Sequence, residues 1–474
     1  MEDMSMNYGN PSKAPGPRGD SRRVVTISAG ANHTVALLAG GIVCSWGRGE
    51  DGQLGHGDAT DRDLPTIVSA LGDCEVSAIT CGADHTTARS DAIRTVYSWG
   101  CSPVHRGDFG RLGHGNSSDL FLPHPIRVLQ GLEIKHMACG DSHCLAISTQ
   151  GEVYSWGRNQ NGQLGLGHCE DSLRPQKVPT FQGVEVKMVA AGAEHTVAIT
   201  ASGKLYGWGW GRYGNLGLGD CKDRAVPAEV VTLNREKMKM VACGWRHTIV
   251  VSEAGNIYSY GWSKYGQLGH GTFQDLLVPH QILVLNDRKI GSIAGGWRHS
   301  MAIDEEGRLY AWGWNKFGQL GCGNTVDQNI PQHVSGIAHE RIEQVSCGWR
   351  HTIVTTERGN VYSWGRGTSG QLGHGDAVDR CTPKLIELLS ADGFACRQLA
   401  SSRSTSLPVS LFVSPSERYA VVPDETLGAT ARRLSQNSNV ESYVAMETDS
   451  SSSVGLDANV PDTDSHTSRL RNAT

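Results

Sequence analysis

Gly296-Trp297-Arg298-His299-Ser300 occurs nearly unchanged at two other places in the chain, 52 residues earlier and 52 residues later. The two related stretches are Gly244–Thr248 and Gly348–Thr352. Spacing this regular indicates an internal repeat, in which each copy folds as one unit and packs against its neighbours. The Gly and the His of the stretch recur in four earlier copies, which makes seven in all. The seven histidines are His33, His85, His143, His195, His247, His299 and His351.

Two further marks recur in every copy and indicate where its strands and turns fall. An aromatic residue followed by Gly occurs at Trp46, Trp99, Trp156, Trp208, Tyr260, Trp312 and Trp364. A Leu followed by Gly occurs at Leu54, Leu112, Leu164, Leu216, Leu268, Leu320 and Leu372. Apolar and polar residues alternate just before the aromatic mark, as in Glu152–Trp156 and Lys204–Trp208. This alternation is typical of short antiparallel strands joined by tight turns.

Seven units of several short strands predict an all-β fold, a seven-bladed β-propeller over residues 23–397 whose blades protect each other's edges. A solenoid is the alternative architecture, but a solenoid needs atypical capping repeats at its ends. Ordinary repeat material stands at both ends of this chain, in residues 24–28 and 383–399, and we expect these segments to zip together and close a ring. Residues 1–22 and 398–474 lack the pattern and are predicted to be a flexible leader and a disordered tail.

Composition argues against several classes of function. The net charge of -5 gives no general affinity for nucleic acid, and no apolar run reaches the roughly 18 residues of a membrane helix. The 13 cysteines are odd in number and lack the paired spacing of a metal site, so we expect no metal and a reducing compartment. No Gly-x-Ser-x-Gly, His-Glu-x-x-His or Walker pattern occurs, and the repeat histidines are expected to be core hydrogen-bonding groups. The sequence therefore does not predict an enzyme.

The two residues before each repeated His vary from copy to copy. Three copies hold a Trp-Arg pair, at Trp245-Arg246, Trp297-Arg298 and Trp349-Arg350. The other four copies hold Ala31-Asn32, Ala83-Asp84, Asp141-Ser142 and Ala193-Glu194. A position that accepts Ala, Asp and Trp is not determined by core packing. We therefore expect the Trp and Arg side chains on a shared surface, and we expect the function of the protein there.

The loop after the aromatic mark changes the sign of its charge along the chain. It is acidic in the first two copies, at Glu50, Asp51 and Asp108, and basic in later copies, at Arg158, Arg212, Lys264, Lys316 and Arg366. A two-fold operator would lay the basic sector of one copy on the acidic sector of another, which predicts an isologous dimer held by ion pairs. The alternative is a solvated face with scattered charges. An Asp that recurs in all seven copies, Asp119 among them, is more consistent with a turn residue.

One segment of the predicted tail, Glu417–Thr426, differs from the rest of it. Acidic flanks surround an apolar centre at Val422-Pro423, with Tyr419 just upstream. The segment is either an ordinary piece of disordered tail or an extended recognition peptide. Composition alone leaves both interpretations open.

The triple Gly-Trp-Arg-His stretch and the tail sequence Tyr419–Glu425 resemble the plant UV-B photoreceptor family, propellers of the regulator of chromosome condensation type. The resemblance implies a homodimer that absorbs UV-B through its tryptophans, without a cofactor, and then separates into monomers. Trp297 and Trp245 match the principal chromophore positions, and Trp349 matches an auxiliary one. The residues that match the family's dimer interface are Arg158, Arg246, Arg298, Arg350, Glu50, Asp51, Asp108, Asp119 and Glu194.

The resemblance also implies partners. Val422-Pro423 matches the dipeptide that docks on the WD40 propeller of an E3 ubiquitin ligase controlling photomorphogenesis. WD-repeat repressor proteins and chromatin or transcription factors are further implied partners, in the cytoplasm and the nucleus. The chain departs from the family in its second copy, where Cys101 replaces a second Trp and the stretch up to Gly110 is longer. The alternative function is nucleotide exchange on a small GTPase, the activity of the fold's founding relative, for which the Trp-Arg triplet and the tail segment are unnecessary.

Overall fold

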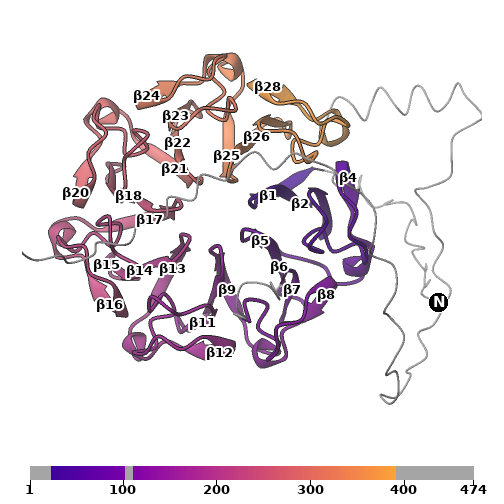
Figure 1. Cartoon of the computed structure of the whole chain (residues 1–474), viewed down its shortest axis with the longest axis horizontal. Coiled ribbons are helices and arrows are strands. Elements are labelled where there is room, and N and C mark those ends of the chain that lie inside the picture. Colours follow the sequence, from indigo (N-terminus) through magenta and orange to yellow (C-terminus); the bar gives the residue numbers. More distant parts are fainter. Residues whose placement is uncertain (1–22, 102–109, 391–474) are drawn as a thin grey trace, which may run out of the picture. The chain divides into compact units, whose positions relative to one another are not determined.

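The computed structural model describes residues 23–101 and 110–390 of the chain. These residues form seven four-stranded antiparallel sheets, and the strands of each sheet follow one another along the chain. The sheets stand around a common centre as the blades of a propeller (Figure 1), so the prediction of an all-β, seven-bladed propeller is confirmed. The predicted leader, the predicted tail and the last residues of the predicted propeller, 391–397, lie outside the described residues.

The blades have nearly identical strand lengths. The first three contain β1 (Val24–Ala29), β2 (His33–Leu38), β3 (Ile42–Gly47), β4 (Arg62–Ile67), β5 (Ala78–Cys81), β6 (His85–Ser90), β7 (Thr95–Gly100), β8 (Leu120–Pro125), β9 (Ile134–Cys139), β10 (His143–Ser148), β11 (Val153–Gly157) and β12 (Ser172–Lys177). The next two contain β13 (Val186–Ala191), β14 (His195–Thr200), β15 (Leu205–Gly209), β16 (Arg224–Glu229), β17 (Met238–Cys243), β18 (His247–Ser252), β19 (Ile257–Gly261) and β20 (Leu276–Gln281). The last two contain β21 (Ile290–Gly295), β22 (His299–Asp304), β23 (Leu309–Gly313), β24 (Gln328–His333), β25 (Ile342–Cys347), β26 (His351–Thr356), β27 (Val361–Gly365) and β28 (Arg380–Leu385).

A three-residue 3-10 helix follows the fourth strand of each blade. These helices are η1 (Ser69–Leu71), η2 (Arg127–Leu129), η3 (Pro179–Phe181), η4 (Val231–Leu233), η5 (Leu283–Leu285), η6 (Ser335–Ile337) and η7 (Glu387–Leu389). None of the helices in the described part of the chain is long and apolar enough to cross a membrane.

Each strand has the residues that its place in the blade requires. The second strand is buried on both faces, as the six buried residues of β18 illustrate. The fourth strand lies at the outer edge (Figure 1) and carries a proline at its fourth position in every blade. Proline cannot donate a ladder hydrogen bond, so it is tolerated at an edge and protects that edge from pairing with other chains. These prolines are Pro65, Pro123, Pro175, Pro227, Pro279, Pro331 and Pro383.

The repeated histidines form an inner ring that joins neighbouring blades. His33 Nε2 lies 3.0 Å from Thr86 Oγ1 of the next blade, and His351 Nε2 lies 3.0 Å from Thr34 Oγ1, which closes the ring. The Thr86 hydroxyl donates onward to the carbonyl of Gln53, so the histidine Nε2–H is the donor in this pair. All seven ring histidines are fully buried, which confirms that they are core hydrogen-bonding groups.

The repeated glycine before each histidine follows from the same close packing. A Cβ added to Gly296 would lie against the ring of His299 and 2.8 Å from the carbonyl oxygen of Gly348 in the next blade. Both neighbours belong to the inner ring and cannot move aside independently. The glycine of the Gly-x-x-His mark is therefore required for the seven blades to pack this closely around the inner ring of histidines.

The repeated tryptophans connect the blades further out. Trp46 donates its indole N–H to the carbonyl of Gln371 in the last blade at 3.0 Å, and Trp156 donates to the carbonyl of Arg111 at 2.9 Å. The same bond to the preceding blade is made by Trp99, Trp208, Trp312 and Trp364. All six are at most 1 % exposed, so they belong to the blade cores.

Trp156→Phe is expected to lower the free energy of unfolding by about 1–3 kcal/mol without changing the fold. The smaller ring leaves a small cavity, and the Arg111 carbonyl loses its indole donor. Tyr260, a single ring at the same place in the fifth blade, is fully buried and shows that such a side chain fits there. Thermal denaturation followed by circular dichroism measures the change, and an unaltered midpoint would contradict it.

The propeller closes by packing of the first blade on the last, and the described strands of the two ends do not share a sheet. β28 pairs with β27, and β1 pairs with β2. The backbone N–H of Ala29 donates to Ser346 Oγ at 3.0 Å, and the Gln344 amide donates to the carbonyl of Val25 at 2.7 Å. The expectation that residues 24–28 and 383–399 zip together is wrong for the described part of these segments, because each end completes a sheet within its own blade.

Candidate functional site

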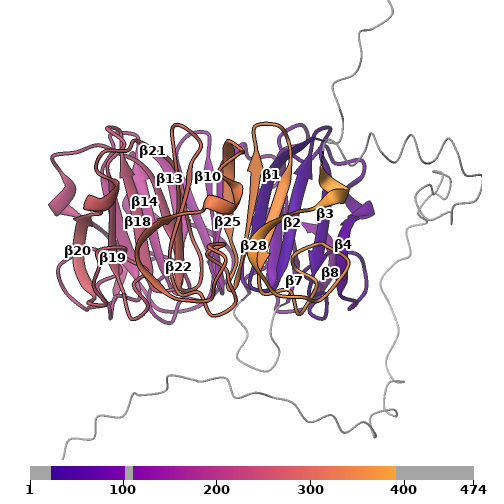
Figure 2. The ribbon, with the colours of Figure 1, turned by 90° about the horizontal axis from the view of Figure 1, so that it is seen from above.

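The Trp-Arg pairs and the loops after the aromatic marks emerge from the same edge of the propeller. In an antiparallel sheet of consecutive strands, the connection between the first two strands and that between the last two lie at one edge. Figure 2 shows the blades from the side, with connections at both rims. Backbone hydrogen bonds join the two kinds of loop, from Trp262 N to Arg246 O at 2.9 Å and from Trp314 N to Arg298 O at 2.8 Å. We call this surface the Trp-Arg face.

Trp297 stands at the centre of a cluster of indoles on this face. Its ring centroid lies 5.4 Å from that of Trp349, nearly parallel to it, and 5.4 Å from that of Trp245 in a tilted arrangement. Trp314 meets Trp297 edge-on at 5.6 Å, and Trp262 meets Trp245 edge-on at 5.5 Å. We call these five residues the aromatic cluster. Because Trp262 and Trp314 are buried and the other three half-buried, the cluster is largely shielded from water.

Arginines lie over the faces of these indoles. The guanidinium carbon of Arg298 is 3.9 Å from the Trp297 centroid and 5.3 Å from that of Trp245, and the side chain donates to the Tyr265 hydroxyl at 2.8 Å. Arg246 lies 3.8 Å from the Trp245 centroid. A guanidinium stacks on an indole because the ring face carries partial negative charge. Arg298 is only 9 % exposed, so its charge acts in a poorly hydrated environment.

Positive charge is concentrated on this side of the face. Arg350 lies 5.0 Å from the Trp297 centroid, and Arg366 lies 4.9 Å from the Phe317 ring. Burial, followed by repulsion from Arg366 and Arg298, lowers the pKa of Arg350 to about 10. The guanidinium remains charged at neutral pH, so this sector favours a carboxylate-rich partner.

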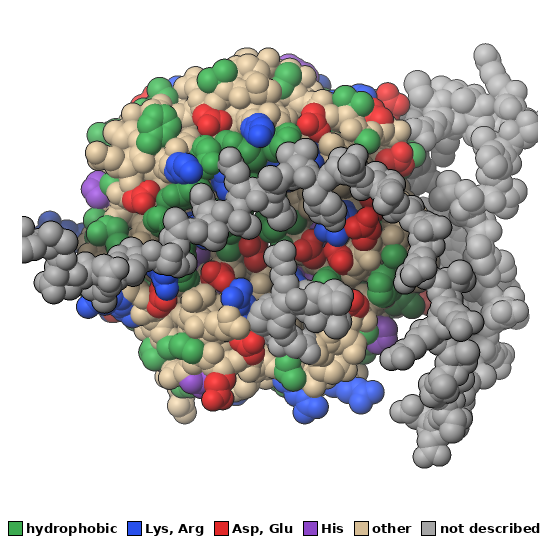
Figure 3. Space-filling view, viewed as in Figure 1, with side chains coloured by type: hydrophobic (Ala, Val, Ile, Leu, Met, Phe, Trp, Pro, Cys, Tyr) green, Lys and Arg blue, Asp and Glu red, His purple; other side chains and the backbone are tan. Residues whose placement is uncertain are grey.

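Acidic side chains gather on the opposite sector of the same face, over the first blades (Figure 3). Burial raises the pKa of the Asp51 carboxyl, and the nearby carboxylates of Asp84, Glu50 and Asp119 raise it further against the opposing effect of Arg48. Clustered carboxylates of this kind are stabilised by added positive charge. The charge division that repeat comparison predicted is therefore present on the folded chain.

Some of the predicted interface charges already have partners within the chain. Arg158 pairs with Glu194 at 2.9 Å, and Arg48 pairs with Glu50 at 2.8 Å and with Asp51 at 3.2 Å. The sequence comparison treated Arg158 and Glu194 as members of opposing sectors and did not include Arg48. Arg158 and Glu194 meet because neighbouring loops at one edge lie within reach of each other, whereas Arg48, Glu50 and Asp51 belong to the same loop between β3 and β4. Any dimer contact must share these groups with the partners they already have.

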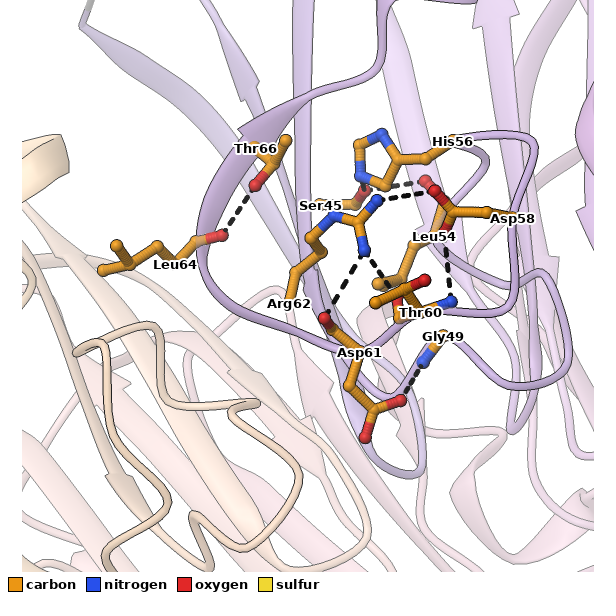
Figure 4. A network of polar contacts seen from close by, with 10 residues as sticks. All are labelled: Ser45, Gly49, Leu54, His56, Asp58, Thr60, Asp61, Arg62, Leu64 and Thr66. Atoms are coloured by element: carbon orange, nitrogen blue, oxygen red, sulfur yellow. Dashed lines mark hydrogen bonds and ion pairs between the residues drawn. The ribbon is translucent and has the colours of Figure 1, made fainter. Parts of the chain in front are cut away.

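The Asp that recurs in every copy has a turn role in six blades. Figure 4 shows the first of these, where Asp61 Oδ1 accepts a hydrogen bond from the backbone N–H of Gly49 at 2.8 Å. The same contact is made by Asp171, Asp223, Asp275, Asp327 and Asp379. The turn interpretation is confirmed for these six. The equivalent donor for Asp119 lies in residues 102–109, outside the described residues, as do Asp108, Val422 and Pro423.

Asp141 is a residue of the face whose importance the sequence did not indicate. It lines the central cavity of about 260 Å³ together with Trp245, Trp297 and Trp349. Burial raises the pKa of its carboxyl to about 7, with a further contribution from Asp84, although a hydrogen bond from the Trp349 indole opposes the shift. Buried Arg111 donates to the Asp141 carbonyl at 2.8 Å. The sequence feature that could have pointed to Asp141 is its carboxylate, which stands at a position where other copies have Ala or Trp.

Comparison with known proteins assigns the chain to a family. Residues 3–238 and 223–407 match the RCC1-like domain. The chain is 62 % identical over 405 residues to the ultraviolet-B receptor UVR8 of Arabidopsis thaliana, covering 85 % of this chain and 91 % of that protein. The chain belongs to the ultraviolet-B receptor family.

More distant relatives share the propeller alone. The human E3 ubiquitin-protein ligase HERC2 is 33 % identical over 402 residues, which are 83 % of this chain but 8 % of that protein. Human WBSCR16 has a TM-score of 0.65 at 24 % identity, covering 73 % of this chain and 93 % of that one. Prp20p of Saccharomyces cerevisiae, described with its binding to Gsp1p and histones, has a TM-score of 0.62 at 23 % identity, covering 70 % of this chain and 82 % of that one. The two structures support the fold of this ultraviolet-B receptor relative.

Proposed function

We propose that this protein is a UV-B photoreceptor whose chromophore is the aromatic cluster of its own tryptophans. The observation that carries the proposal is the environment of Trp297. Its ring centroid lies 5.4 Å from those of two further indoles, and the guanidinium carbon of Arg298 lies 3.9 Å from it. Tryptophan is the strongest near-ultraviolet absorber among the side chains, so light capture needs no added cofactor. The high identity to a named ultraviolet-B receptor supports this function.

In the proposed mechanism, light acts on the charges that hold a dimer together. Excitation of Trp297 together with Trp245 changes the charge distribution of both indoles, through local transfer of charge or energy within the cluster. Arg298 and Arg246 lie directly against these rings and therefore experience the change most strongly. Their contribution to ion pairs across the interface is then lost, and the dimer separates.

The proposed dimer is isologous and places the basic sector of one chain on the acidic sector of its partner. A single exposed ion pair contributes only about 0–1 kcal/mol, so this dimer requires many pairs acting together. Such an interface is weakened by salt, because mobile ions screen charges near the surface. Loss of a few central pairs is then sufficient to open it.

Size-exclusion chromatography in the dark and after UV-B irradiation tests the proposed function. The native protein is expected to elute at the size of a dimer in the dark and of a monomer after irradiation. A second dark sample at high salt is expected to shift toward the monomer without light. Elution at one size under dark and irradiated conditions at low salt contradicts the proposal.

Arg298→Ala is expected to weaken the dark dimer by about 30-fold or more. The change removes a buried guanidinium from the centre of the face and leaves carboxylates of the partner without their cation, a loss of about 2–5 kcal/mol for a buried charge pair. Sedimentation in the dark at low salt measures the dissociation constant. Arg235→Ala is the matched control, because Arg235 is exposed on the connection between η4 and β17, at the opposite edge of the blades. A dark dimer of native strength in Arg298→Ala contradicts the charge-held interface.

The proposed signal output is recruitment of an E3 ubiquitin ligase of photomorphogenesis through its WD40 propeller, with Val422-Pro423 as the docking dipeptide. Replacing both residues with Ala is expected to abolish binding to that WD40 domain and to leave light-driven dissociation intact. A second Val-Pro dipeptide of the predicted tail, Val460-Pro461, supplies the matched control. Equal pull-down of the domain by the native chain and the Val422→Ala, Pro423→Ala variant contradicts the docking role.

Further proposed partners are WD-repeat repressor proteins and chromatin or transcription factors, in the cytoplasm and nucleus.

A further inference from the structure

Two sulfurs and an imidazole meet where the second and third blades pack together. Cys139 and Cys144 are directly paired across strands β9 and β10, and their sulfurs lie 3.5 Å apart. His85, the first residue of β6, places its Nε2 3.0 Å from Cys144 Sγ. The three ligand atoms all lie within 4.8 Å of one another.

The inner ring is different at this blade junction from the other six. Elsewhere the ring histidine meets a hydroxyl of the next blade, as His143 meets Thr196 at 2.9 Å and His247 meets Ser300 at 3.0 Å. Cys144 stands at the position of that hydroxyl. Sulfur also recurs at the position of Cys139 in other blades, at Cys81, Cys243 and Cys347. Among the seven described junctions, only this one brings two sulfurs to one histidine.

The ionisation of these thiols differs accordingly. Burial raises the pKa of Cys243 to about 12, which keeps that thiol protonated. Burial acts on Cys139 in the same direction, but hydrogen bonds from Cys144 and His85 outweigh it and lower the Cys139 pKa to about 5. Burial and the neighbouring Cys139 raise the pKa of Cys144 well above its usual range. Independently of these pKa values, two sulfurs and one imidazole nitrogen within 4.8 Å of one another are the soft donor set that suits a thiophilic cation.

We propose that His85, Cys139 and Cys144 form a binding site for a thiophilic divalent metal ion of the zinc class. Zinc bonds of about 2.3 Å to sulfur and about 2.0 Å to nitrogen, at tetrahedral angles, place the ligands roughly 3.5–3.8 Å apart. The sulfur–sulfur distance of 3.5 Å is already in this range, and the distance of 3.0 Å between His85 Nε2 and Cys144 Sγ requires an expansion of about half an ångström. Soft thiolate ligands select zinc over magnesium or calcium.

Access to the site is provided by the central cavity. Cys139 is half-buried and lines this cavity of about 260 Å³, whereas His85 and Cys144 are fully buried behind it. An ion therefore reaches Cys139 Sγ first, and a water molecule from the cavity can complete the coordination. Metal–sulfur bonds form as thiol protons leave to solvent, so affinity increases with pH.

Titration of the reduced protein with Co²⁺ in the absence of oxygen tests the proposal. Tetrahedral cobalt with thiolate ligands absorbs in the visible range, away from the tryptophans. The native chain is expected to develop this absorption with one equivalent of Co²⁺, and added Zn²⁺ is expected to remove it. Absence of the absorption, or its persistence in excess Zn²⁺, would overturn the assignment.

Cys144→Thr is the decisive variant, because five of the other six blades have Thr at this position and the sixth has Ser. It is expected to fold like the native chain, as judged by thermal denaturation, and to bind Co²⁺ at least about tenfold more weakly. Cys243→Ser is the matched control, since it removes a half-buried thiol from the position that corresponds to Cys139 in another blade and is expected to retain the visible absorption. Equal absorption in Cys144→Thr and the native protein would assign the ion to other thiols, such as exposed Cys169 or Cys221, and refute the site.

Discussion

Trp297→Phe is expected to abolish UV-B-driven dissociation while leaving the propeller and the dark dimer intact. Trp297 contacts both other indoles of the repeated Trp-Arg stretch and lies beneath the Arg298 guanidinium. Phe keeps an apolar ring for Arg298 to stack on but absorbs little UV-B. Since other blades place Ala at this position, packing does not require the indole there.

Chromatography before and after irradiation measures the effect, with Trp156→Phe as the matched control. Trp156 is buried in a blade core, so its loss is expected to reduce thermal stability and to leave a light response. Absorption by the remaining tryptophans does not by itself open the dimer under the proposed mechanism. If Trp297→Phe dissociates at the native UV-B dose, the chromophore is elsewhere in the chain.

Acid is expected to unfold the propeller steeply between about pH 6.5 and pH 4. Burial, in most cases with repulsion from neighbouring ring histidines, lowers the pKa of five ring histidines to about 3 and that of His351 to about 4. These groups stay neutral in the native state, whereas the unfolded chain binds their protons near the ordinary value of about 6.5. The stability they contribute is complete above that pH and is lost as the pH falls below it. Each histidine costs about 1.4 kcal/mol per pH unit in this range.

Six such groups acting together exceed the stability of an ordinary domain, about 5–15 kcal/mol, within roughly two pH units. Thermal midpoints measured at several pH values between 7 and 4.5 test the expectation, together with proton uptake on denaturant unfolding at pH 5.5. His195→Gln is expected to reduce the uptake by about one proton. His124→Gln is the control at an exposed position. A midpoint that does not change between pH 7 and pH 5 would contradict the neutral ring.

The repeat alone was sufficient to predict the architecture, since its marks correspond to contacts that every blade must make. Gly296 and its equivalents have no room for a Cβ beside the histidine ring, and the repeated indoles each donate to the preceding blade. Such constraints act at one position of each copy, so comparison of copies reveals them without coordinates. The same comparison separated Trp297 and Arg298 from the core, because positions that packing does not determine vary between copies.

Contacts between copies depended on the tertiary structure. Arg158 and Glu194 pair within the chain, and the indole of Trp349 reaches Asp141 of another blade. His85 meets Cys144 although 59 positions separate them. The repeat period places such residues at one radius and height, but the loops and the blade spacing determine whether two side chains touch. Ion pairs and metal coordination require direct contact, so only the folded propeller shows which residues pair.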